Sequence, residues 1–133
     1  MNILYADDDA DDREIFCEAI KEINPAIKVV LGKDGEETLK ILSVQKELPQ
    51  VIFLDINMPK MDGKQTFLAI KQDRELQNIP VTIFSTSSSE TESSFFRKYD
   101  TPYFVKPVKE KELSRIAADI LKYCSHHHEL NSN

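Results

Sequence analysis

Short apolar runs alternate along the chain with stretches whose apolar residues recur at helical spacing. Five runs have the length and the β-branched or aromatic composition of buried strands; they occupy residues 3–6, 27–31, 51–54, 81–84 and 103–105. The stretches that follow carry apolar residues on one helical face, at positions 15–23, 39–42, 67–71, 95–99 and 113–121. Strands that alternate with helices predict a parallel sheet with right-handed crossovers. The sequence therefore predicts an α/β fold of the (βα)5 type, a doubly wound five-stranded parallel sheet with helices on both faces.

Two predicted helices begin with the same polar signal. Asp34, with Glu37 three residues on, has the arrangement of a capping box, and Ser89 with Glu92 repeats that spacing before the fourth helix. The fourth helix is rich in Ser and Thr, which are poor helix formers. We therefore expect it to be the softest element of the fold.

Four of the predicted strands end in residues that phosphoryl chemistry uses. These residues are Asp7-Asp8, Asp55, Ser85-Thr86 and Lys106-Pro107. In an open α/β sheet, ligands bind outside the carboxyl ends of the strands. We therefore expect an acid pair, a single aspartate, a hydroxyl and a lysine to meet at one rim of the sheet.

Together with the run Asp-Ile-Asn-Met-Pro-Lys-Met-Asp-Gly at residues 55–63, these motifs resemble the receiver domain of response regulators (CheY-like) over nearly the whole chain. The resemblance implies the flavodoxin-like strand order 2-1-3-4-5. It also implies a stand-alone, single-domain response regulator of a two-component phosphorelay. Such a protein takes a phosphoryl group from a sensor histidine kinase or a phosphotransfer protein, and signals through a separate downstream target or relays the phosphate to it. It is a phosphoacceptor that catalyses its own phosphotransfer and autodephosphorylation, not an enzyme acting on other substrates.

Asp55 is the predicted phosphoryl acceptor, because a carboxylate can attack phosphorus and carry an acyl phosphate. The carboxylate and the incoming phosphoryl group are both anionic, so the reaction needs a hard cation, and Mg²⁺ prefers carboxylate, phosphate and water oxygens. Asp8 and Asp55 are the expected carboxylate ligands, with Asp7 nearby through water. The resemblance adds the backbone carbonyl of Asn57 to this metal site, in which Mn²⁺ is expected to substitute for Mg²⁺.

The resemblance also implies roles for the residues around Asp55. Lys106 would bridge the Asp55 carboxylate and later the phosphoryl oxygens, and its peptide bond to Pro107 would be cis. Ser85 would donate a hydrogen bond to the phosphoryl group, and Tyr103 occupies the position of an aromatic switch. The signal would leave through the fourth helix, the fifth strand and the fifth helix, and the protein would be a monomer or a weak dimer through that face.

Two positions depart from the pattern of the family. Thr86 follows the switch hydroxyl where many relatives carry a smaller Ala, which adds bulk near the phosphoryl site. The segment 98–102 lacks the Gly that often stands before the fifth strand, so the shape of that loop is open.

Length and charge narrow the classes of partner. The 133 residues fit one domain, predicted over 1–124 with a polar tail over 125–133. A net charge of −6 without a basic block argues against nucleic acid. No apolar stretch approaches the roughly 20 residues of a membrane span, and no secretory signal is visible, so we expect a cytoplasmic protein with no membrane partner. We expect no disulfide between Cys17 and Cys124, and the run His126–His128 is interpreted as incidental.

Three alternatives compete with this interpretation. Asp7, Asp9 and Asp11 followed by Glu18 resemble a calcium loop of the EF-hand type, although Asp12 stands where the sharp turn needs Gly.

A phosphatase of the haloacid-dehalogenase type also uses an aspartate at a strand end, but it needs a second Asp as general acid where this chain has Asn57. A receiver-like domain that is never phosphorylated would typically lack the acids or the lysine.

Overall fold

The computed structural model describes residues 1–107 and 109–131, with side chains up to Cys124. Its strands are β1 (Asn2–Ala6), β2 (Lys28–Gly32), β3 (Val51–Asp55), β4 (Val81–Ser85) and β5 (Tyr103–Val105). Its helices are α1 (Ala10–Ile23), α2 (Gly35–Val44), α3 (Gly63–Gln72), α4 (Glu90–Arg97) and α5 (Glu110–Asn131). The strands pair in parallel in the order β2-β1-β3-β4-β5. The predicted fold and strand order are confirmed.

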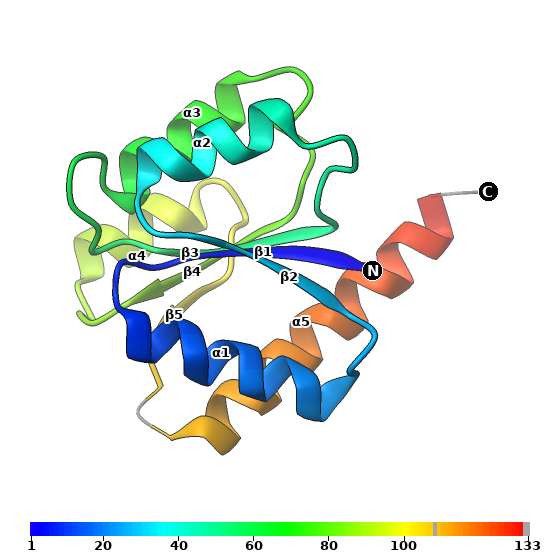
Figure 1. The fold of residues 1–133 in the computed structure, drawn as a ribbon. Coiled ribbons are helices and arrows are strands. Elements are labelled where there is room, and N and C mark those ends of the chain that lie inside the picture. Colours follow the sequence, from blue (N-terminus) through cyan, green and yellow to red (C-terminus); the bar gives the residue numbers. More distant parts are fainter. Residues whose placement is uncertain (108, 132–133) are drawn as a thin grey trace.

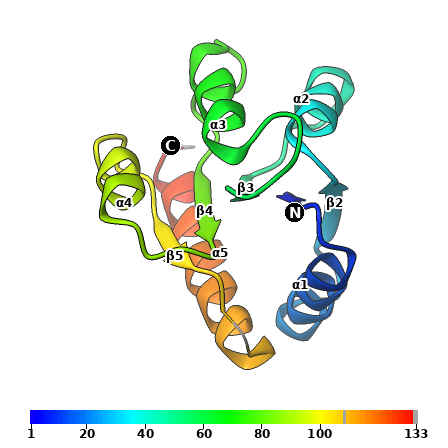
Figure 2. The ribbon, with the colours of Figure 1, turned by 90° about the vertical axis from the view of Figure 1, so that its left-hand side faces the viewer.

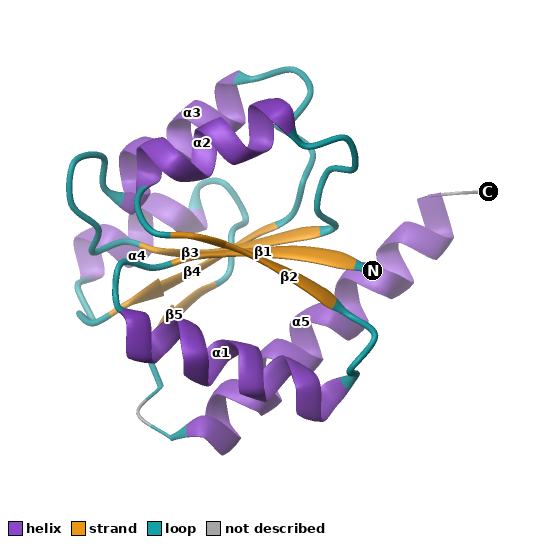
Figure 3. Ribbon diagram, in the orientation of Figure 1, coloured by secondary structure: helices purple, strands orange, loops and turns teal. Residues whose placement is uncertain are grey.

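The sheet forms the middle layer of a three-layer molecule, with α2 and α3 on one side and α1 and α5 on the other (Figures 1 and 3). Alternate residues of β1 divide between two apolar clusters. Leu4 packs with residues of α2, α3 and α4, such as Phe67 and Phe96, whereas Ile3 packs with residues of α1 and α5, such as Phe16. The two-residue period of the strand therefore supplies a core on each face of the sheet.

Side-chain caps start the helices near the predicted places. Asp34 accepts a hydrogen bond from the Glu37 amide at 2.8 Å, but the Glu37 carboxylate accepts from Lys33, so this predicted capping box is only half formed. A complete box, which was not predicted from the sequence, opens α3 between Asp62 and Gln65.

At the other end of the chain, α5 runs on to Asn131, so the backbone stays helical past the point where the polar tail was expected to begin. The domain boundary at residue 124 stays a prediction. None of the helices in the described ranges is long and apolar enough to cross a membrane.

In the loop before β5, an aspartate takes the place of the missing glycine. Asp100 has a φ of 54°, in the left-handed region that Asp and Asn tolerate better than other residues with a side chain. The neighbouring Thr101 amide then donates to the Phe96 carbonyl at 3.1 Å, which closes the end of α4 onto the loop. The absence of a glycine from residues 98–102 is thus accommodated within the loop itself.

Gly63 lets the start of α3 approach the end of β3, the strand that carries Asp55. The Gly63 amide donates to the Ile56 carbonyl at 2.9 Å. A Cβ atom at this position would lie 2.5 Å from the Asp55 carbonyl oxygen and 2.5 Å from the Ile56 Cα atom. Both neighbours are backbone atoms at the base of the site, so they cannot move aside as a flexible side chain could. Glycine is therefore required at this contact.

The substitution Gly63→Ala should lower the free energy of unfolding by about 1–3 kcal/mol, because the added methyl group overpacks rigid backbone. Urea unfolding followed by circular dichroism measures this change. Gln72→Ala, which puts the same residue at an exposed position of α3, is the control and should stay within about 0.5 kcal/mol of the wild type. Equal stabilities for the two variants would contradict the close approach at Gly63.

Candidate functional site

The carboxyl ends of the strands face the viewer in Figure 2. The predicted acids lie at this edge of the sheet. Asp7 and Asp8 follow β1, and Asp55 is the last residue of β3. One carboxylate oxygen from each of the three lies within 4.8 Å of the other two. Asp7 is 0% exposed and Asp55 1% exposed, whereas Asp8 is open to solvent. The predicted meeting of these three aspartates is confirmed.

Lys106 brings one positive charge into this group of acids. Its Nζ atom lies 2.6 Å from Asp7 Oδ2, 2.7 Å from Asp12 Oδ2 and 3.5 Å from Asp55 Oδ2. The expected approach of Lys106 to Asp55 is therefore confirmed. The shorter contacts, however, are to Asp7, which precedes α1, and to Asp12, which lies on α1. Asp12 was missed as a site residue, although its place in the acidic run 7–12 was a signal.

The backbone of Lys106 explains how the side chain is aimed. None of the peptide bonds among the described residues is cis, so the prediction of a cis bond between Lys106 and Pro107 is wrong. The trans form is intrinsically favoured by about 0.5–1 kcal/mol. The Lys106 amide donates to the Ser85 carbonyl at 2.7 Å, which extends the pairing with β4 beyond the end of β5. This pairing and the length of the lysine side chain together bring the Lys106 ammonium group to the acids.

Neighbouring groups hold Asp7 and Asp55 in place. Asp7 Oδ1 accepts from the Asp9 amide at 3.0 Å, and Asp7 Oδ2 accepts from the hydroxyl of the buried Tyr5, whose ring stacks on Phe16. Burial first, and then the charge of Asp7, raises the pKa of the Tyr5 hydroxyl, which stays a hydrogen-bond donor. Asp55 Oδ1 accepts from the Asn57 amide at 3.2 Å. Of these three aspartates, Asp8 is the one exposed to solvent.

The site carries more negative than positive charge. Burial, and then the charge of Asp7, raises the pKa of Asp55 from 3.8 to about 7, against the opposing effect of Lys106. Burial lowers the pKa of Lys106, but the carboxylates of Asp12, Asp7 and Asp55 outweigh it and raise that pKa above its ordinary value. Lys106 is therefore an ammonium group. An excess of carboxylate oxygens at one rim fits a hard divalent cation such as Mg²⁺.

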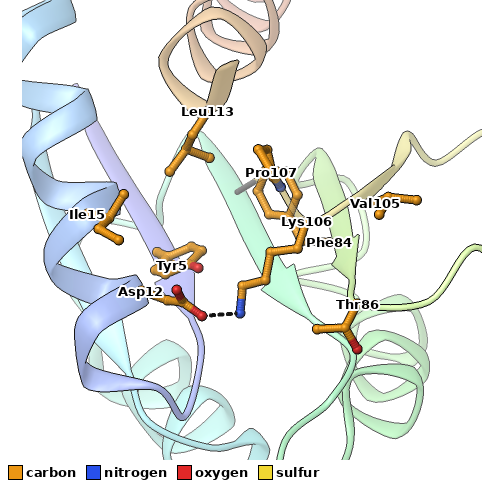
Figure 4. A pocket seen from close by; sticks show the side chains of 9 residues that line it. All are labelled: Tyr5, Asp12, Ile15, Phe84, Thr86, Val105, Lys106, Pro107 and Leu113. Atoms are coloured by element: carbon orange, nitrogen blue, oxygen red, sulfur yellow. Dashed lines mark ion pairs between the residues drawn. The ribbon is translucent and has the colours of Figure 1, made fainter. Parts of the chain in front are cut away.

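An open pocket of about 440 Å³, with Asp12 and Lys106 among its lining residues, lies between α1 and the end of β5. Figure 4 shows the Lys106 side chain extended toward Asp12, with Tyr5 beside Asp12 and Thr86 on the far side of Lys106. The ammonium group thus lies at the wall of a pocket that a small anion can enter from solvent.

The other predicted residues lie on the β4 and β5 side of the rim. Asn57 Oδ1 accepts from the Thr86 hydroxyl at 3.0 Å and from the Thr86 amide at 3.3 Å, which ties the loops after β3 and β4 together. Ser85 and Tyr103 both donate to one carboxylate oxygen of Glu92 on α4, at 2.9 and 2.8 Å. Neither hydroxyl is bonded to Asp55 in this structure. The spacing of Glu92 after Ser89 had indicated only a helix cap.

Comparisons with known proteins agree with this geometry. Residues 3–118 match the response regulator receiver domain family. Response regulator Rcp1 of Synechocystis sp. is 28% identical over 124 residues, which cover 89% of this chain and 84% of Rcp1. The probable methanogenesis regulatory protein FilR2 of Methanothrix harundinacea is 25% identical over 126 residues, which cover 91% of this chain and 81% of FilR2.

Two solved structures are similar in fold and sequence. The crystal structure of the Mn²⁺-bound form of Rcp1 superposes with a TM-score of 0.78 at 27% identity, covering 90% of each chain. That of the phosphorylated cyanobacterial phytochrome response regulator RcpA superposes with a TM-score of 0.79 at 30% identity, covering 92% of this chain and 91% of RcpA. The acids lie at the predicted rim, and the family match covers nearly the whole chain. The chain therefore belongs to the response regulator receiver domains.

Proposed function

We propose that Asp55 accepts a phosphoryl group from a phosphohistidine on a sensor kinase or a phosphotransfer protein. The observation that carries this proposal is the position of Asp55. It is a nearly fully buried carboxylate at a strand end, with the Lys106 ammonium group 3.5 Å away and the carboxylates of Asp7 and Asp8 beside it. In a chain of the receiver family, this is the carboxylate placed to react with phosphorus.

The chemistry follows from these contacts. An Asp55 carboxylate oxygen attacks the phosphorus atom, the bond from phosphorus to the donor's histidine nitrogen breaks, and that nitrogen keeps the electron pair. The product is an acyl phosphate on Asp55. Lys106 can neutralise part of the charge on the phosphoryl oxygens, because its ammonium group is already next to the attacking carboxylate. Hydrolysis reverses the modification when water attacks the same phosphorus and Asp55 leaves.

We infer that Mg²⁺, or Mn²⁺ in its place, is held by Asp8, Asp55 and the Asn57 carbonyl, with Asp7 nearby through water. The cation supplies the positive charge that lets two anionic groups approach each other. Asp7 is less suited to direct binding, since its Oδ2 atom already contacts both the Lys106 ammonium group, at 2.6 Å, and the Tyr5 hydroxyl. The Mn²⁺-bound form of Rcp1 and the phosphorylated form of RcpA support the assignment by similarity.

The competing functions fit the described residues less well. In an EF-hand the Asp9 carboxylate would ligate calcium, but here Asp9 Oδ1 accepts from the Asp12 amide and caps α1. A phosphatase needs a general acid at position 57, and the Asn57 amide oxygen instead accepts from Thr86. An inert receiver-like module would have no use for two buried carboxylates, those of Asp7 and Asp55, next to Lys106.

The proposed biology is that of a cytoplasmic response regulator with separate partners. The kinase or phosphotransfer protein would dock at the acid rim, and the phosphorylated chain would act on a separate protein or pass the phosphate on. The face of α4, β5 and α5 is the proposed output surface, and any dimer would be weak and form there. With a net charge of −6, the chain is not proposed to bind nucleic acid.

Acetyl phosphate or phosphoramidate with Mg²⁺ should add one phosphoryl group to the wild-type protein, and Asp55→Asn should take none. Intact mass spectrometry measures the label. Asp11→Asn, a change at an exposed acid of the same rim, is the matched control and should be labelled like the wild type. Label on Asp55→Asn, or complete labelling in excess chelator, would refute the proposal.

Asp55→Asn should stabilise the metal-free protein by about 1–3 kcal/mol at pH 7.5 and by little at pH 4.5. The folded Asp55 has a pKa of about 7 against an ordinary 3.8, so the folded state holds an extra proton between these values and the wild type loses stability as the pH rises through that range. Removing the charge also relieves its repulsion with Asp7, while Lys106 keeps Asp7 and Asp12 as partners.

Urea unfolding with a chelator at the two pH values measures the gain, and Asp11→Asn serves again as control. Adding Mg²⁺ should then stabilise the wild type and not Asp55→Asn. A gain of the same size at both pH values would contradict the proposed charge repulsion at Asp55.

A further inference from the structure

One carboxylate oxygen on α4 holds both residues that were predicted to switch. Glu92 Oε1 accepts a hydrogen bond from Ser85 Oγ at 2.9 Å and another from the Tyr103 hydroxyl at 2.8 Å. Ser85, at the end of β4, is fully buried, whereas Tyr103, at the start of β5, and Glu92 are partly buried. A single side chain therefore joins the strand next to Asp55, the last strand of the sheet and the first turn of α4.

The local sequence does not account for this use of Glu92. Ser89 Oγ accepts from the Glu92 amide at 3.3 Å, which is the first half of a capping box. In the second half, the Glu92 carboxylate would accept from the Ser89 amide, but that amide donates to Ser87 Oγ at 3.1 Å. In α3, by contrast, the capping box is complete. The Glu92 carboxylate is thus diverted from its helix toward the sheet.

The number of hydroxyl protons limits what Ser85 can bind. A serine hydroxyl carries one hydrogen and can donate to one acceptor at a time. In this structure the Ser85 hydrogen goes to Glu92, and Ser85 Oγ also accepts from the Ser87 amide at 3.1 Å. A phosphoryl oxygen on Asp55 that takes this hydrogen must therefore displace Glu92. Ser85 is fully buried in this structure, so losing Glu92 without gaining a new acceptor would leave a buried donor unsatisfied.

Tyr103 is held differently. Its hydroxyl lies within hydrogen-bond distance of both Glu92 Oε1 and the Ser87 carbonyl oxygen, the latter at 2.7 Å. If Glu92 moves away, the Tyr103 hydroxyl still has the Ser87 carbonyl as acceptor. The same displacement therefore frees Ser85 for a new partner and leaves Tyr103 bonded to the loop after β4.

We propose that Glu92 is a latch, a positioning residue that competes with the phosphoryl group for the single hydroxyl hydrogen of Ser85 and so couples the state of Asp55 to the first turn of α4. This inference rests on the proposed phosphorylation of Asp55. In the unphosphorylated protein the latch is closed, with Glu92 bonded to Ser85 and Tyr103. A phosphoryl group captures Ser85, and its negative charge also disfavours a carboxylate nearby.

The short length and limited burial of α4 let it respond when Glu92 releases Ser85. The helix has only eight residues, and the one it buries fully is Phe96, in its second half. Its first turn is joined to the sheet by the Glu92 carboxylate, which accepts from Ser85 on β4 and Tyr103 on β5. Opening the latch breaks this attachment at Ser85 and frees the first turn, next to β5, to change position.

The test is the affinity for beryllofluoride, a mimic of the phosphoryl group, measured with Mg²⁺ from backbone amide shifts in nuclear magnetic resonance spectra. Glu92→Ala should bind beryllofluoride about fivefold to tenfold more tightly than the wild type, because no bond to Ser85 has to be broken. Glu92→Gln keeps an acceptor oxygen and should gain less. Glu90→Ala removes an exposed acid from the same turn of α4 and should change the affinity by less than twofold.

A double-mutant cycle separates the latch from simple charge repulsion. In a Ser85→Ala background, Glu92→Ala should no longer improve beryllofluoride binding, because the contested hydrogen is absent. Charge repulsion alone predicts equal gains for Glu92→Ala and Glu92→Gln, and gains that persist without Ser85; that result would overturn the latch. Thermal melts show whether each variant is folded. If Glu92→Ala is unfolded, Glu92→Gln takes its place in the double-mutant cycle.

Labelling by phosphoramidate distinguishes a failure of the latch from a failure of the proposed function. Wild-type protein that takes label at Asp55, combined with unchanged beryllofluoride affinity in Glu92→Ala, would reject the latch and leave the proposed function standing. Wild-type protein that takes no label at Asp55 would reject the proposed function, and the latch with it.

Discussion

Lys106 places a single ammonium group among three carboxylates, and the geometry of the rim depends on that placement. Asp7 is completely buried, and a buried carboxylate left without its partner destabilises a protein by several kcal/mol. The lysine is aimed by backbone pairing with Ser85, so the same strand end that presents the Ser85 hydroxyl also fixes the position of the Lys106 ammonium group. Gly63 brings α3 close behind Asp55, and the stacked pair of Tyr5 and Phe16 supports Asp7 from the core.

The charges of the rim are only partly balanced, and this imbalance gives the site its chemistry. One lysine cannot neutralise Asp7, Asp12 and Asp55 together. Burial, and after it the charge of Asp7, raises the pKa of Asp55 against the opposing effect of Lys106. Proteins violate local stability rules mainly at functional sites. In the proposed function, a divalent cation would offset part of this excess negative charge and so let an anionic phosphoryl group approach Asp55. The proposed latch at Glu92 would then couple the phosphorylation of Asp55 to the first turn of α4.

The sequence predicted the strands and the acids at their ends because both signals are local. Apolar runs such as that before Asp55 mark buried parallel strands, and parallel strands bring their carboxyl ends to one edge. Contacts between distant elements leave no such pattern. The pairing of Asp12 with Lys106 and the diversion of Glu92 from its helix cap both depend on tertiary packing. The cis bond at Pro107 was expected from resemblance alone, and the backbone reaches the same end in the trans form.

We propose that the acids at this rim form a site for a divalent cation at the phosphoryl acceptor. The decisive measurement is a titration of the wild type and of Asp8→Asn with Mg²⁺, followed by backbone amide shifts. We expect saturable shifts at Asp55, Asn57 and Thr86 in the wild type, and an affinity at least tenfold weaker in Asp8→Asn. Equal affinities in both proteins, or a response specific to Ca²⁺ that disappears in Glu18→Gln, would contradict it.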